Sequence, residues 1–382
     1  MSRYNVKIER LIDIDLGIFL AAIWGKYFYF GFSYKGNRVL GAGEGVRVDY
    51  DTQLIEPIPV VNNPYFFDYM KLDVTRIVLT GEGGISAFDK YGAYCSLSLG
   101  YDGWLNSAID YDAEKIFVAG EPYSYFIEKF LLLKKSDTNR YIDPIYKPEM
   151  VEFIDYNPFD GTEIRCPLVL VTESLNEKGR EDLYKDLKIE DIKQIIRSIT
   201  VVKNAMCATS LPFGLAIGAD VERYTGDGSI KPLYIFVNKD QIENYRKNYK
   251  LGEAIKEISP FYVQELNYYN GWLLVSEFNR GYAIRVSDGK IVEFRYGGIV
   301  LKQSLRDERE FWFGNAGKGI LVVRYDKERD TWEEMVELSE EINQAIDEQV
   351  GTRYISSLVP IDYGEVLVGT ENKGCFVLWV YE

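Results

Sequence analysis

One short pattern recurs eight times along the chain and constrains its fold more than any other feature. Each copy has three or four large apolar residues, then one or two small residues, and usually an acid. The copies are Phe28–Ser33, Ile77–Glu82, Ile116–Glu121, Leu168–Glu173, Leu215–Asp220, Trp272–Glu277, Phe311–Ala316 and Val366–Glu371. Recurrence at about 40 to 57 residues is typical of stacked supersecondary units, and all-β units of this length indicate the blades of a β-propeller.

The last part of the chain shows how one unit is built. Residues 355–361, 364–371 and 374–381 read as three strands, separated by two tight turns that contain glycine. In an earlier unit, Ser287-Asp288-Gly289 separates two alternating strands, which is a strong hairpin pattern. We therefore expect an all-β chain that forms a single propeller domain over residues 1–382. Eight repeats are counted, and seven blades are the alternative.

The N-terminal residues are predicted to close the ring. The final unit ends after its third strand, so its sheet would expose an unpaired edge. Residues 4–12 alternate apolar and polar side chains, with Tyr4, Val6 and Ile8 on one face. We expect this segment to add the missing strand of the last blade.

Three long spacings between repeats are predicted to hold short helical insertions, near residues 176–200, 239–258 and 331–350. The first places its apolar residues largely on one helical face, the second is polar and basic, and the third is acidic. Each insertion could dock a partner or cap a sheet edge, and the sequence leaves both roles open.

Two units carry a more specific motif. Residues 311–314 read Phe-Trp-Phe-Gly and are followed by Arg324-Tyr325-Asp326, while residues 366–370 read Val-Leu-Val-Gly-Thr and are followed by Gly374. These units resemble the propeller repeats of two-component sensor proteins, whose consensus has an apolar-Trp-apolar-Gly-Thr strand, a Gly-led strand and then Arg-Tyr-Asp. The other repeats match in apolar pattern alone. The resemblance implies the propeller fold and says little about activity, because propellers host unrelated functions.

The charge of the chain favours some partners and excludes others. Its formal net charge is −15, so nucleic acid and anionic membranes would be repelled, whereas basic proteins and cations are favoured. Histidine is absent, which removes Ser-His-Asp and Cys-His catalysis and His-ligated zinc. Any chemistry would have to use carboxylates, Tyr, Lys, Cys or a metal held by oxygen.

The N-terminal apolar stretch bears on localisation. Residues 16–24 are apolar, but Asp13 and Asp15 come directly before them, which does not suit a secretion signal. The stretch is also shorter than the ~20 apolar residues that span a bilayer. We read it as a buried strand of a cytoplasmic protein. Abundant Glu, Lys and Tyr with no His further suggest a thermophilic source.

The acid that closes the repeat is the most distinctive candidate site. An acid stands there in six of the eight copies, against about one expected from average acid content. The six residues are Glu82, Glu121, Glu173, Asp220, Glu277 and Glu371. If the repeated segments are second strands, these acids share one rim of the ring and could bind a cation or a basic partner. Alternatively, duplication copied a favourable turn residue.

Two classes of function fit these features. The sequence favours a non-enzymatic protein-interaction or assembly platform, with a protein partner, no catalytic residue and no cofactor. The alternative is a divalent-cation-dependent hydrolase or lactonase with carboxylates lining the central channel. Calcium takes 6 to 8 oxygen ligands and needs no histidine. The aspartates considered for such a site are Asp13, Asp15, Asp110, Asp112 and Asp155, which have no recognised calcium-loop spacing.

Overall fold

A computed structural model gives the fold for the part of the chain that it describes. The described residues are 4–13, 15, 17–33, 45–49, 51–52, 54–57, 69–81, 84–98, 104–121, 124–133, 140–142, 149–150, 152–156, 163–167, 205–219, 234–236, 247–248 and 263–381. Within them, nearly all regular structure is β-strand, so the predicted all-β class is confirmed.

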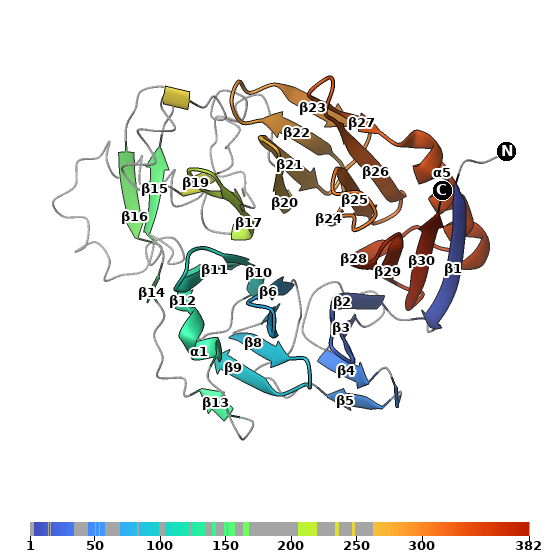
Figure 1. Cartoon of the computed structure of the whole chain (residues 1–382), viewed down its shortest axis with the longest axis horizontal. Helices are drawn as coiled ribbons and strands as arrows, with labels where there is room; N and C mark the ends of the chain where they lie inside the picture. Colours follow the sequence, from blue (N-terminus) through green and yellow to red (C-terminus); the bar gives the residue numbers. More distant parts are fainter. Residues whose placement is uncertain are drawn as a thin grey trace, which may run out of the picture.

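Six sheets of four or five strands form complete blades, which we name by their strands (Figure 1). From the innermost strand outward they are β2 (Gly17–Trp24), β3 (Tyr27–Ser33), β4 (Gly45–Asp49) and β5 (Ile55–Pro57); β6 (Tyr69–Lys71), β7 (Arg76–Gly81), β8 (Gly84–Asp89), β9 (Tyr94–Ser98) and β13 (Arg140–Ile142); β10 (Trp104–Asp110), β11 (Lys115–Glu121), β12 (Tyr125–Glu128) and β14 (Glu149–Met150); β20 (Val263–Tyr269), β21 (Trp272–Glu277), β22 (Gly281–Arg285) and β23 (Ile291–Phe294); β24 (Val300–Gln303), β25 (Glu310–Asn315), β26 (Gly319–Asp326) and β27 (Thr331–Glu334); and β28 (Ile355–Asp362), β29 (Glu365–Thr370), β30 (Cys375–Tyr381) and β1 (Asn5–Ile12).

The remaining described elements are shorter. One sheet has three strands, β17 (Ala205–Leu211), β18 (Gly214–Ala219) and β19 (Tyr234–Phe236), and one pair is formed by β15 (Glu152–Tyr156) and β16 (Glu163–Pro167). The helices are α1 (Lys129–Leu133) and α5 (Val336–Gln349). Contacts join β28 to β2, β2 to β7, β7 to β10, β10 to β17, β17 to β20, β20 to β24 and β24 to β28, which closes a ring (Figure 1).

The repeated segments fall on equivalent strands. Seven of the eight correspond to β3, β7, β11, β18, β21, β25 and β29, each of which is second from the inside of its sheet. The eighth, residues 168–173, lies outside the described residues. The count of eight repeats, with seven blades as the alternative, is nevertheless wrong as a blade count, because the described residues form six complete blades. The repeat marks second strands, whereas a complete blade also needs a third and a fourth strand among the described residues.

The N-terminal strand completes the last blade, as the sequence predicts. β1 pairs antiparallel with β30, in a register that runs from Asn5 opposite Tyr381 to Ile12 opposite Cys375. The same strand contacts the neighbouring blade, because the Arg10 guanidinium donates hydrogen bonds to the carbonyl oxygens of Gln349 (2.9 Å) and Val350 (3.2 Å) at the end of α5. Ring closure therefore joins the N-terminal strand β1 to both β30 and the end of α5, which lie more than 300 residues away in sequence.

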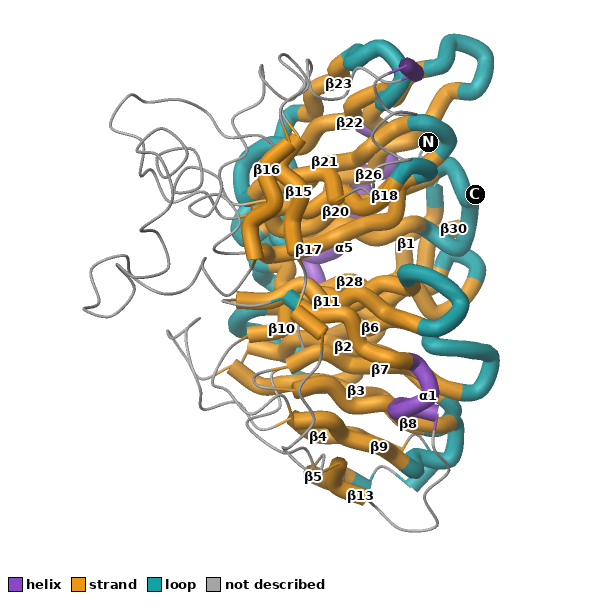
Figure 2. Tube along the Cα trace, turned by 90° about the vertical axis from the view of Figure 1, so that its left-hand side faces the viewer, coloured by secondary structure: helices purple, strands orange, loops and turns teal. Residues whose placement is uncertain are grey.

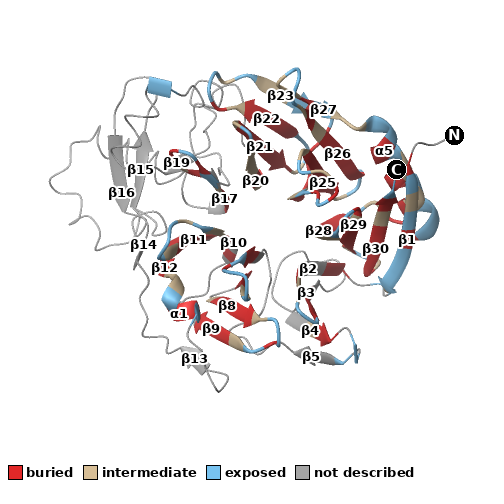
Figure 3. Cartoon of the chain, viewed as in Figure 1, coloured by how far each residue is buried: buried red, intermediate tan, exposed pale blue. Residues whose placement is uncertain are grey.

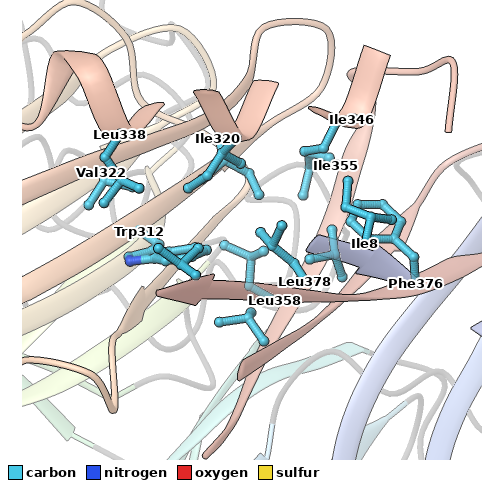
Figure 4. Packing of buried hydrophobic residues seen from close by; sticks show 14 of the residues in the cluster. Ile8, Trp312, Ile320, Val322, Leu338, Ile346, Ile355, Leu358, Phe376 and Leu378 are labelled. Carbon is cyan, nitrogen blue, oxygen red and sulfur yellow. The ribbon is translucent and has the colours of Figure 1, made fainter. Parts of the chain in front are cut away.

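The core consists of layers between adjacent blades. Along β21, Leu273 and Val275 pack in one buried cluster, whereas Trp272 and Leu274 pack in the cluster on the opposite face. Both faces of the strand are buried, which explains why the repeat is a continuous apolar run and not an alternating one. The layer between the β24–β27 blade and the last blade also includes side chains of α5 and β1, and Figure 4 labels ten of its residues: Ile8, Trp312, Ile320, Val322, Leu338, Ile346, Ile355, Leu358, Phe376 and Leu378.

The small residue of the repeat has a packing reason. A Cβ added at Gly369 would lie 2.6 Å from the carbonyl oxygen of Ile18, and one added at Gly314 would lie 2.8 Å from a methyl group of Ile355. Both contacted residues belong to the next blade of the ring. A larger side chain here would therefore push two blades apart.

Helix α5 substitutes for part of a fourth strand. β27 pairs only with residues 323–326 of β26, so the edge formed by residues 319–322 needs other partners. Asn343 accepts a hydrogen bond from the backbone N–H of Ile320 and donates one to its carbonyl oxygen, both at 2.8 Å, and Ser339 Oγ accepts from the N–H of Val322 at 2.9 Å. The helix thus caps a sheet edge.

Of the three predicted helical insertions, the one near 331–350 begins with strand β27 and continues as α5. The insertion near 176–200 lies outside the described residues, as does the one near 239–258 apart from residues 247–248.

Polar side chains connect the innermost strands across the ring. Asn267 of β20 donates to the carbonyl oxygen of Leu301 in β24 at 3.0 Å, and Ser107 of β10 accepts from the N–H of Ala208 in β17 at 3.1 Å. These strands have no sheet partner on the channel side, so side chains of the adjacent blade supply hydrogen bonds that a ladder would otherwise give.

Candidate functional site

The structure describes part of the predicted acidic rim. Glu277 is the last residue of β21, Glu121 is the last residue of β11, and Glu371 follows the end of β29 by one position. The side chain of Glu121 lies outside the described residues, as do Glu82, Glu173 and Asp220 entirely. Of the six acids, the structure describes the side chains of Glu277 and Glu371.

Glu277 is buried without a hydrogen-bond partner for one carboxyl oxygen. The residue is 4% exposed, and its Oε1 has no partner among the described residues. Its cross-strand neighbour is Val263, and its backbone N–H donates to the carbonyl oxygen of Arg280 at 2.8 Å. Burial raises the pKa of Glu277 to about 8, while the nearby Arg280 lowers it and Glu293 raises it further. This carboxyl is consequently protonated over much of the neutral pH range.

The register shows that Glu277 and Glu371 are not equivalent positions. The last residues of β25 and β29 are Asn315 and Thr370, which are 2% and 0% exposed. Asn315 donates to the carbonyl oxygens of Phe278 and Gly297, at 2.9 and 2.8 Å, and Thr370 donates to that of Gly374 at 2.8 Å. Glu277 therefore corresponds to two buried polar residues that donate to backbone carbonyl oxygens, whereas Glu371 is half-buried one residue further along.

The rim also carries basic residues in the same turns. Arg280, Lys318 and Lys373 lie in the turns between the second and third strands of three successive blades. Arg280 donates to the hydroxyl of Tyr282 at 3.4 Å, the Lys318 ammonium lies 5.4 Å from the ring centroid of Tyr296, and Lys373 pairs with Asp15 at 2.6 Å. Both signs of charge therefore occur on this rim.

The aspartates considered for calcium have other partners. Asp13 pairs with Arg10, Asp15 with Lys373 and Asp110 with Lys129, while Asp112 accepts hydrogen bonds from the backbone N–H groups of Glu114 and Lys115 at 2.8 and 2.7 Å. The side chain of Asp155 is not among those described. In the part of the chain that the structure describes, no three His, Cys, Asp or Glu side chains are grouped so that they could hold a metal ion.

One face of the ring carries most of the exposed large apolar side chains. Successive strands of a blade are antiparallel, so the turns between first and second strands and between third and fourth strands open on one face, which we call the turn face. Eight of the eleven exposed large apolar residues that the structure describes lie on it. They are Leu54, Val74, Tyr91, Phe130, Leu133, Leu305, Tyr363 and Tyr381. Figure 2 shows turns of this face, α1 and the C-terminal end of the chain on its right-hand side, and Figure 3 shows exposed residues at turns and along the edge strand β1, and buried ones along the inner strands.

Sequence reasoning missed these side chains, although a local pattern marks several of them. Val74 stands between Asp73 and Thr75, Tyr91 stands between Lys90 and Gly92, and Tyr363 lies between Asp362 and Gly364. A large apolar residue within a polar or glycine-containing turn has no strand to pack in. The exposed fractions bear this out, since Val74 is 83% exposed, Tyr91 is 85% exposed and Tyr363 is 65% exposed.

Comparisons with known proteins found likeness to solved structures alone. No protein-family model matches the chain, and no curated protein matches it. Among solved structures, the extracellular domain of a hybrid two-component system from B. thetaiotaomicron has a TM-score of 0.42 and 10% identity, over 96% of this chain and 39% of that one. A chain of the COPII outer coat vertex on membranes has a TM-score of 0.48 and 7% identity, over 97% and 84% of the two chains. A chain of the COPII coat assembled on membranes has the same TM-score and identity, over 97% and 46%.

The resemblance of the repeats to β-propeller repeats is confirmed by the ring of blades itself. Among the described residues, no helix has the length and apolar character needed to cross a membrane.

Proposed function

We propose that this protein is a non-enzymatic interaction or assembly platform and that a protein partner docks on its turn face. The observation that carries the proposal is the concentration of exposed apolar side chains there, eight of the eleven in the described residues. Single exposed apolar residues are ordinary on a protein surface, but a collection on one face is typical of an interaction site.

The platform needs no conformational change to present these side chains. Seven of them stand on turns between paired strands or on α1, and Tyr381 is the last residue of β30. Helix α1 is itself fixed by its backbone and by buried Leu131 and Leu132. A rigid scaffold that holds variable turns is the usual arrangement for recognition by loops. It also limits the conformational entropy that binding would remove.

Affinity capture with matched variants tests the proposal. The bait is the full chain with Val74→Ser and Tyr91→Ser, compared with wild type and with a control carrying Leu11→Ser and Tyr354→Ser. The control residues are 38% and 47% exposed and lie away from the turn face. We expect quantitative mass spectrometry to find proteins captured from cells of the source organism by wild type and control but lost from the turn-face variant. Equal capture by both variants would reject the turn face as the docking surface.

A further inference from the structure

We infer that one sector of the turn face, over three successive blades, binds a basic protein segment that also carries large apolar side chains. This inference rests on the proposed function and specifies its partner. The sector comprises the turns of the β2–β5, β6–β9 and β10–β12 strands together with α1. It holds the two most exposed apolar residues of the turn face, Tyr91 (85%) and Val74 (83%), together with Leu54 (56%), Phe130 (55%) and Leu133 (38%).

Contacts between blades make this sector one continuous surface. Lys26, in the first turn of the β2–β5 blade, pairs with Asp49, which begins the turn that carries Leu54. A Cβ added at Gly25 would lie 2.1 Å from the carbonyl oxygen of Lys90, so the neighbouring turn, which carries Tyr91, lies directly against it.

On the other side of the sector, the guanidinium of Arg76 donates to the carbonyl oxygen of Leu132, which joins the β6–β7 turn to α1. The backbone N–H of Lys129 donates to the carbonyl oxygen of Glu114 at 2.7 Å, which joins α1 to the β10–β11 turn. Because the turns are already fixed to one another, a partner would meet a preformed surface.

The charged side chains of this sector that form no ion pair within the described residues favour a basic partner. Of the seven cations whose side chains the structure describes in this sector, six are engaged within the molecule: Lys26 and Lys129 in ion pairs, Arg76 with a carbonyl oxygen, and Arg47, Lys90 and Lys115 over the rings of Tyr27, Trp24 and Phe126. Lys71 is the exception. Four exposed carboxylates, Asp51, Asp73, Asp112 and Glu114, form no ion pair within the described residues. The unpaired charge is therefore acidic, and a basic segment complements it.

The apolar side chains and the carboxylates are interleaved. Val74 directly follows Asp73, and the turn of Asp51 ends at Leu54. A segment in which Lys or Arg alternates with Leu-like residues could bury its apolar side chains between ion pairs, which matches the usual combination of apolar anchors and a polar rim. An anionic membrane or a nucleic acid would instead meet these carboxylates as like charges.

Fluorescence anisotropy with two short labelled peptides tests the inference. One peptide alternates Lys and Leu, and the other alternates Glu and Leu. We expect the Lys-Leu peptide to bind wild type at least about tenfold more tightly than the Glu-Leu peptide, with an affinity that falls as salt is added. Val74→Ser with Tyr91→Ser should weaken it by about tenfold, as expected when anchor side chains are lost.

Matched controls distinguish binding of the Lys-Leu peptide at this sector from its nonspecific attraction to an acidic protein. Leu11→Ser with Tyr354→Ser should leave the affinity for the Lys-Leu peptide within about twofold of wild type, because both residues lie off the turn face. Equal effects of the two double variants, or equal binding of both peptides, would overturn the inference. A captured cellular partner that requires Val74 and Tyr91 but stays bound at high salt would also overturn it while leaving the platform function standing.

Discussion

At the scale of single residues, the buried Glu277 makes stability depend on pH. Its pKa is raised to about 8, chiefly because burial disfavours the charged form. A carboxyl with a raised folded-state pKa contributes stability that is fully present below its unfolded pKa, near 4.5, and is lost as pH rises through about 8. We expect the free energy of unfolding to fall between these limits, by up to about 1.4 kcal/mol per pH unit from this group.

Urea unfolding of Glu277→Gln over this pH range checks the prediction. The amide cannot ionise, so the variant should lose most of the decline that wild type shows. Glu371→Gln is the matched control, since Glu371 is half-buried and closes another copy of the repeat. If wild type and Glu277→Gln share the same pH slope, Glu277 is not the group responsible.

Asp330 is a second residue with an effect beyond its own turn. It has a φ of 46° and accepts hydrogen bonds from Trp272 Nε1 at 3.0 Å, from the Tyr325 hydroxyl at 2.7 Å and from Arg285. Hydrogen bonds from Tyr325 and then Trp272 are the main causes that lower the pKa of Asp330 to about 2. The residue thus joins the β20–β23 and β24–β27 blades through one carboxylate.

We expect Asp330→Ala to lower the free energy of unfolding by about 2 kcal/mol, because it leaves the buried Trp272 N–H without a partner. Asp326→Ala is the control: Asp326 accepts hydrogen bonds from the backbone N–H groups of Glu328 and Arg329 within its own turn. Chemical denaturation should rank Asp330→Ala as clearly the less stable variant. The opposite ranking would mean that Asp330 does not couple the two blades.

At the scale of elements, the N-terminal strand should be essential to the ring. Deleting residues 1–12 exposes the edge of β30 and removes Tyr4 and Ile8 from the buried layer that also contains α5. It also removes the contacts of Arg10 with the end of α5. We expect aggregation or a large fall in melting temperature, measured by size-exclusion chromatography and calorimetry.

A single substitution tests the contact of the Arg10 side chain with α5 separately from the backbone pairing of β1 with β30. Arg10→Ala keeps the backbone pairing of β1 but loses the hydrogen bonds to Gln349 and Val350 and the exposed ion pair with Asp13, so we expect a loss of about 1 kcal/mol, mainly from the hydrogen bonds. A deletion variant that melts like wild type would show that β30 does not need β1.

The sequence predicts some elements better than others for physical reasons. Second strands such as β21 and β29 are buried on both faces, so their apolar runs stand out in any reading of the sequence. Outer strands such as β5 and β19 have only three residues each and leave little pattern, which is why the number of complete blades could not be predicted. The N-terminal strand was predictable because a missing edge strand is a definite structural need.

The candidate site was harder to predict because it depends on register. Aligning Glu277 with Glu371 by sequence looks natural, yet their strands end one residue apart relative to these acids. Since neighbouring positions of a strand face opposite sides, a shift of one residue changes burial and role together. The buried equivalents of Glu277 are Asn315 and Thr370, which share its position but not its charge.

At the scale of the whole molecule, the question is whether the ring holds a metal or a partner. A platform that docks a protein on its turns should be indifferent to calcium, because scattered surface carboxylates bind it weakly and are screened by salt. The alternative, a hydrolase with a carboxylate-lined channel, would bind calcium only in the folded ring. Such a site would add about 2.7 kcal/mol of stability at a calcium concentration about 100 times its dissociation constant.

Melting curves in EDTA and in increasing calcium distinguish the two. We expect the melting temperature to stay essentially unchanged, because Asp13, Asp15 and Asp110 pair with Arg10, Lys373 and Lys129 and would have to release these cations to bind a metal. Magnesium at equal ionic strength is the control for screening. A saturable rise specific to calcium, abolished by replacing one or two of Asp13, Asp15 and Asp110 with Asn, would instead favour the hydrolase, because only a built site gives saturation and specificity together.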